Sequence, residues 1–133
     1  MIPPFTDTGV LPPGVHPATL AEIEARFGGS WELRRAQMDS VRWMLELATR
    51  AGVQRIVLNG SFVTDIMEPN DVDCVLLAAA TPPADKAAEC ELLEGLPFLD
   101  ILLVGQTDFD YFVNRFFASD RALEAKGMIE VLK

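Results

Sequence analysis

The fold is decided by a short stretch near the middle of the chain, residues 55–61, which reads Arg-Ile-Val-Leu-Asn-Gly-Ser. Its β-branched and apolar residues are typical of a buried strand, and the Gly60-Ser61 pair ends that strand in a tight turn. Further buried strands are predicted at residues 72–77 and 98–104. A Gly-Ser turn beside a helix start exposes backbone N–H groups, so we expect this one to suit phosphate oxygens.

Three aspartates accompany these strands. Asp71 and Asp73 are two residues apart, and because residues i and i+2 of a strand share a face, their carboxylates are predicted to lie side by side. Asp100 lies inside the apolar third strand, where burying a carboxylate is costly unless it binds a cation or finds a partner. Three converging carboxylates make an oxygen-rich site for Mg²⁺, which takes substrate phosphates as further ligands.

Each feature also has a simpler explanation. Asp71 suits a turn after Pro69 and Asn70, and a Gly-Ser pair suits an ordinary strand-to-helix turn. Asp100 is also explained by an ion pair with an arginine such as Arg55. The joint occurrence of the three features, in this order on neighbouring strands, favours the metal site.

Helices are predicted between and after these strands. A capping box at Thr19 begins a short helix, and Ser30 is expected to cap a longer one that ends at Gly52. The charged residues of the long helix are interpreted as a solvated face: Arg34, Arg35, Arg42 and Glu46. Further helices are predicted near residues 81–95 and 107–119, and a last strand at 126–132. This order predicts an α/β (α+β) fold, a small mixed sheet of about four strands with helices packed on it.

Residues 1–17 hold five of the nine prolines and are predicted to form an extended arm, with residues 18–133 as a single domain. The arm is expected to pack on the body of the protein. Because extended arms often mediate dimers, a homodimer is a possible assembly.

The composition excludes several classes of protein. A net charge of −9 argues against broad nucleic-acid binding and against an anionic membrane surface. No apolar stretch approaches the roughly 20 residues of a membrane span, and no signal peptide is evident. Cys74 and Cys90 lack metal-site spacing and are interpreted as reduced, largely buried thiols. We therefore expect a cytoplasmic protein.

The pattern of Gly-Ser after one strand, Asp-x-Asp on the next and a lone Asp on a third resembles the nucleotidyltransferase fold, which includes DNA polymerase beta and small bacterial minimal nucleotidyltransferases. It is carried here by residues 58–62, 70–73 and 99–101. Residues 11–19, 60–64 and 126–129 also resemble the signatures of an uncharacterised bacterial family with this fold. Together these stretches cover nearly the whole chain.

The resemblance implies a specific set of roles. Gly60 and Ser61 would hold the phosphates of ATP or another nucleoside triphosphate. Asp71 and Asp73 would ligate two Mg²⁺ ions, and Asp100 would bind one of them and help to deprotonate an acceptor hydroxyl. The implied reaction transfers a nucleoside monophosphate, and the acidic surface favours a protein or small-molecule acceptor over a nucleic acid.

The sequence departs from this pattern in one respect. Active minimal nucleotidyltransferases usually carry a basic residue shortly after Gly-Ser, whereas residues 62–68 contain two acids and no cation. Candidates to replace it are Arg55, Lys86, Arg115 and Lys126. The alternative function is a weakly active or inactive binding protein, such as the antitoxin of a toxin–antitoxin or phage-defence pair, with a toxin as its protein partner.

Overall fold

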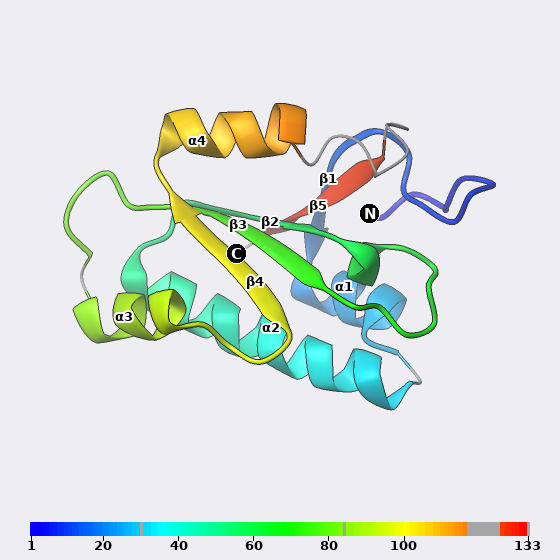
Figure 1. Cartoon of the computed structure of the whole chain (residues 1–133), viewed down its shortest axis with the longest axis horizontal. Coiled ribbons are helices and arrows are strands. Elements are labelled where there is room, and N and C mark those ends of the chain that lie inside the picture. The colour runs from blue at the N-terminus through cyan, green and yellow to red at the C-terminus, as the bar shows by residue number, and fades with distance from the viewer. Residues whose placement is uncertain (30, 84, 117–125, 133) are drawn as a thin grey trace.

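The computed structural model describes residues 1–29, 31–83, 85–116 and 126–132, which form one five-stranded sheet between two layers of helices (Figure 1). The strand order is β1-β5-β2-β3-β4. The outer pairs β1–β5 and β3–β4 are parallel, whereas β2 pairs antiparallel with both β5 and β3. The strands are β1 (Gly14–Thr19), β2 (Arg55–Asn59), β3 (Val72–Leu77), β4 (Leu99–Val104) and β5 (Gly127–Leu132).

The mixed sheet is confirmed, but the expected number of about four strands is too low. The additional strand, β1, lies at an edge and crosses the boundary drawn at residue 17 between arm and domain. Pro17 falls within it, opposite Glu130 of β5. A proline is tolerated in an edge strand because the N–H that it lacks has no partner strand on the outer side. The prolines of residues 1–17 therefore favoured an irregular arm where the structure has strand β1.

Helices cover the two faces of the sheet unequally (Figure 1). Three lie on one face: α1 (Leu20–Phe27), α2 (Glu32–Ala51) and α3 (Lys86–Glu94). The other face carries α4 (Gln106–Tyr111), which continues as a π-helical turn over Phe112–Phe116. Each face of the sheet has its own hydrophobic core. Because side chains alternate along β2, Ile56 and Leu58 pack in the larger core and Val57 packs in the smaller one.

The predicted helix boundaries are partly confirmed. Thr19 forms the capping box with Glu22 that begins α1, and Gly52, at φ 77°, ends α2. The residue before α2 is Trp31, which makes no side-chain cap, while Ser30 lies outside the described residues. Helix α3 begins later than expected because Asp85 accepts a hydrogen bond from the Ala88 N–H.

The cysteine interpretation is half confirmed. Both thiols are free, and Cys74 is fully buried in the larger core. Cys90 on α3 is exposed rather than buried. Among the residues that the structure describes, no helix is both long and apolar enough to cross a membrane.

The N-terminal arm packs against its own chain. The Arg26 guanidinium donates to the carbonyls of Ile2 and Pro3 and lies over the Phe5 ring. Leu11 is fully buried, and its carbonyl accepts a hydrogen bond from the Gly127 N–H at 2.9 Å. The arm thus contacts the first residue of β5 through a backbone hydrogen bond. A homodimer formed through the arm stays a prediction.

Substituting Gly127→Ala is expected to lower the free energy of unfolding by about 2 kcal/mol, because the added methyl group would meet the Pro12 carbonyl and the Leu11 side chain. Urea unfolding followed by circular dichroism measures the change. Gly29→Ala is the matched control, since nothing lies within 4 Å of its Cβ position. An equal effect of the two substitutions would contradict the described packing of the arm.

Candidate functional site

The connection between β2 and β3 is closed by a single side-chain pair. The Ser61 N–H and hydroxyl both donate to Asp71 Oδ1, at 2.9 and 2.7 Å. The Ser61 hydroxyl oxygen accepts the Asn70 N–H at 2.9 Å, and the Phe62 N–H donates to the Asp71 carbonyl at 3.1 Å. These bonds fix the Gly-Ser turn directly beside the start of β3.

The sheet register brings the three predicted carboxylates to one end of the strands. Asp73 lies opposite Asn59 on β2 and opposite Asp100 on β4. Gly60 lies beneath the first two acids, because a Cβ atom there would be 3.0 Å from both Asp71 Oδ1 and Asp73 Oδ2. With its φ of 86°, Gly60 is also in a conformation that favours glycine. Asp71 and Asp73 therefore converge on the turn that the sequence indicated.

The electrostatics of the site centre on Asp73. Burial, followed by repulsion from Asp71 and then Asp100, raises the pKa of Asp73 to about 6. The positive charge of Lys126 opposes this shift. Lys126 directly precedes β5 and is therefore close enough to Asp73 for its charge to act on that carboxylate.

Asp100 differs from its expected environment. It is exposed near the start of β4 rather than buried within the strand, so the expected cost of burying it does not arise. The suggested partner Arg55 instead forms an ion pair with Glu130, at 2.6 and 2.9 Å, which raises the pKa of Arg55. The alternative explanation of Asp100 as the partner of Arg55 is therefore wrong.

The metal-binding capacity of the three carboxylates stays a prediction. Within the described ranges, no group of three or more His, Cys, Asp and Glu side chains is placed to hold a metal ion. One oxygen of Asp71 is engaged by Ser61, which leaves its Oδ2 together with the carboxylates of Asp73 and Asp100 as donors. Mg²⁺ keeps several waters and takes substrate phosphates as ligands, so a partial set of protein carboxylates suits it better than a closed protein cage.

Arg34 holds residues 62–66, which follow the Gly-Ser turn, and this role was not among the sequence predictions. Its guanidinium is buried and donates to the carbonyls of Phe27, Phe62, Thr64 and Ile66. Burial lowers its pKa, and the charge of the nearby Asp65 opposes that effect. The interpretation of Arg34 as part of a solvated face is therefore wrong.

A signal for this burial was present in the sequence. Arg34 precedes Met38 and Val41 by four and seven residues, so the three share the face of α2 that packs into the core.

Comparison with known proteins places the chain in a family. Residues 3–132 match a family model described as "Family of unknown function (DUF6932)". No curated protein and no solved structure matches the chain.

Replacing Arg34 with methionine is expected to lower the free energy of unfolding by about 3 kcal/mol, because buried carbonyls lose their donors while side-chain volume is largely kept. The exposed neighbour provides the control, and Arg35→Met should change stability by less than about 0.5 kcal/mol. Urea unfolding of both variants decides the matter. Equal stabilities would show that the Arg34 hydrogen bonds contribute little.

The raised pKa of Asp73 makes stability depend on pH. Between about pH 4 and pH 6 the unfolded chain gives up this proton while the native protein keeps it, so rising pH favours unfolding. Asp73→Asn removes the penalty. We expect it to raise the free energy of unfolding by about 1 kcal/mol at pH 8 in metal-free buffer, allowing for solvent screening, and to have little effect at pH 4.

Urea unfolding of wild type and Asp73→Asn at the two pH values, with a chelator present, measures this difference. The exposed Asp7→Asn is the control, for which we expect the same small effect at both pH values. An Asp73→Asn variant that is no more stabilised at pH 8 than at pH 4 would contradict the burial of Asp73 beside two other acids.

Proposed function

We propose that this chain, which belongs to the DUF6932 family of unknown function, is a Mg²⁺-dependent nucleotidyltransferase with the nucleotidyltransferase fold. It would move a nucleoside monophosphate from ATP or another nucleoside triphosphate to a hydroxyl acceptor. The observation that carries the proposal is the convergence of Asp71 and Asp73 on Gly60, beside Ser61. The pairing of Asp73 with Asp100 across β3 and β4 supports it.

The residues of the site fit the proposed metal. Asp71, Asp73 and Asp100 offer the hard carboxylate oxygens that Mg²⁺ prefers. Burial and repulsion from Asp71 and Asp100 raise the pKa of Asp73, and a divalent cation would stabilise its charged form. When bound, the metal supplies Lewis-acid stabilisation of the attacking and leaving oxygens.

The chain's own groups would each have one task. Asp100, exposed at the edge of the cluster, would take the proton of the acceptor hydroxyl as its oxygen attacks the α-phosphorus. The bond from the α-phosphorus to the oxygen bridging to the β-phosphorus breaks, and pyrophosphate leaves. The Gly60-Ser61 turn would bind the departing phosphates, with the Ser61 hydroxyl exchanging its bond to Asp71 for one to a phosphate oxygen.

Lys126 is the candidate for the positive charge that residues 62–68 lack. Of the other cations considered, Arg55 is held by Glu130, and Lys86 begins α3 on the opposite face of the sheet (Figure 1). Arg115 lies in the π-helical turn after α4 and is not among the charges that act on Asp73. Lys126 is close enough to Asp73 for its charge to act on that carboxylate. We therefore assign it to the triphosphate rather than to the metal.

The acceptor follows from the charge of the protein. A net charge of −9 repels polyanions, so a protein or small-molecule hydroxyl is favoured over RNA or DNA.

Calorimetric titration with ATP, GTP, CTP and UTP in Mg²⁺ tests this function. We expect wild type to bind at least one triphosphate only when Mg²⁺ is present, and Asp71→Asn/Asp73→Asn to lose that binding. Lys126→Met should weaken triphosphate binding about tenfold, the loss expected for one charge-assisted contact. Lys86→Met is the matched control and should bind like wild type.

A second candidate function is a non-catalytic binding protein, such as the antitoxin of a toxin–antitoxin or phage-defence pair. It is favoured by the net charge of −9 and by the lack of a basic residue in residues 62–68, which follow Gly-Ser. Wild-type protein that binds none of the four triphosphates, yet co-purifies in a stable complex with the product of an adjacent gene, would replace the enzyme with this candidate.

A further inference from the structure

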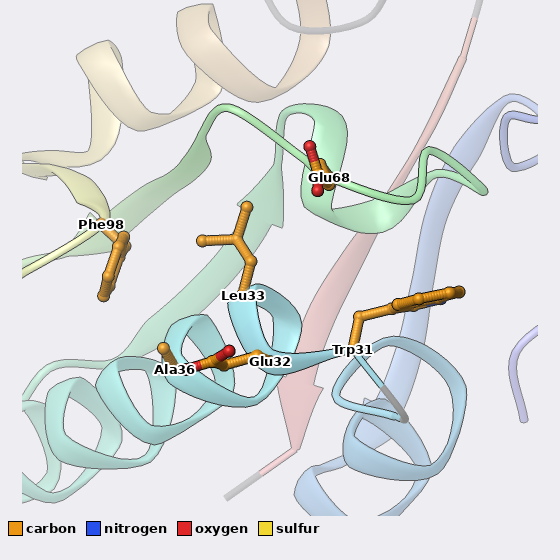
Figure 2. A pocket seen from close by; sticks show the side chains of 6 residues that line it. All are labelled: Trp31, Glu32, Leu33, Ala36, Glu68 and Phe98. Carbon is orange, nitrogen blue, oxygen red and sulfur yellow. The ribbon is translucent and has the colours of Figure 1, made fainter.

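A groove of about 490 Å³ opens at the start of α2, on the side of the β2–β3 connection that faces the helix (Figure 2). It lies between the first turns of α2 and the segment that carries Glu68, with Phe98 at one end and Trp31 at the other. Its size is that of a small-molecule site rather than of a gap between side chains. The lining residues are Trp31, Glu32, Leu33, Ala36, Glu68 and Phe98.

Two aromatic side chains are held at the ends of this groove. Trp31 is 51% exposed and Phe98 is 49% exposed, although rings of this size are usually buried. Phe98 also has a φ of 68°, which is the one positive value among the described residues other than glycine. Such strain in a bulky residue persists only where the surroundings impose it, and it concentrates at binding sites.

The charged side chains that line the groove are both negative. Its only charged lining residues are Glu32 and Glu68, and neither forms an ion pair with any residue in the described part of the chain. The N-terminus of α2 contributes about half a positive charge, which two full carboxylates outweigh. Aromatic faces attract cations as well, so the groove suits a positive group on an apolar body.

We propose that this groove binds a small organic cation, a primary ammonium or guanidinium group carried on an apolar body. The groove lies on the α2 side of the β2–β3 connection, whereas Asp73 is on the strand face that Val75 shares with the α4 core. The binding of the cation therefore does not depend on the proposed nucleotidyltransferase activity.

Tryptophan fluorescence tests the binding directly. The chain has two tryptophans, so Trp43→Phe leaves Trp31 as the only reporter. We expect benzylammonium to change the Trp31 emission in a saturable way, and the neutral analogue benzyl alcohol to bind at least tenfold more weakly. Glu32→Gln/Glu68→Gln should weaken benzylammonium binding at least tenfold, whereas the control Glu46→Gln, exposed on the same helix, should not.

Equal binding of the charged and neutral probes, or unchanged affinity in the Glu32→Gln/Glu68→Gln variant, would overturn the proposal. The test is independent of nucleotide binding. Asp71→Asn/Asp73→Asn is expected to keep benzylammonium binding while losing Mg²⁺-dependent triphosphate binding. A wild-type protein that binds benzylammonium but no triphosphate would therefore support the groove and count against the proposed transferase.

Discussion

The site depends on the two hydrogen bonds that Ser61 donates to one oxygen of Asp71. These bonds join the two ends of the β2–β3 connection. Gly60 therefore lies against the carboxylates of Asp71 and Asp73, and Asp73 stays paired with Asn59. On the far side of the same connection, the buried guanidinium of Arg34 satisfies the carbonyls of Phe62, Thr64 and Ile66. The connection between β2 and β3 is mostly irregular, and it is held on one side by the Ser61–Asp71 bonds and on the other by Arg34.

The cost of this arrangement is electrostatic. Three acids gather at one end of the sheet, and the pKa of Asp73 is raised by its burial and then by repulsion from the other two. The fold offsets part of the repulsion by passing β5 between β1 and β2, which brings Lys126 to the acidic end. The negative charge that remains is what the proposed divalent cation would neutralise.

Much of the fold could be predicted from local signals. The capping box at Thr19, the left-handed Gly52 and the apolar strand of residues 55–59 depend only on neighbouring residues, and each is where the pattern indicated. Strand β1 could not be found in this way, because its pairing with β5 is set by residues far along the chain and its prolines suggest an irregular arm. The Asp71–Asp73 pair followed from strand periodicity, whereas the exposure of Asp100 and the approach of Lys126 follow from the order of strands in the sheet, which periodicity does not encode. The helical spacing of Arg34 indicated its burial, but most of the carbonyls that it binds lie about 30 residues away in the sequence.

The pairing of β1 with β5 also constrains how the protein is made. Gly14 pairs with Gly127, so the edge strand β1 has no partner until β5 has been synthesised. Until then β2 lacks its β5 neighbour as well, and the acidic end of the sheet lacks Lys126. Contacts so distant along the chain form slowly, because the intervening loop must close before they contribute. The three acids lie on β3, on β4 and in the turn between β2 and β3, so they can come together before β5 pairs with β2, whereas Lys126 reaches them only with β5.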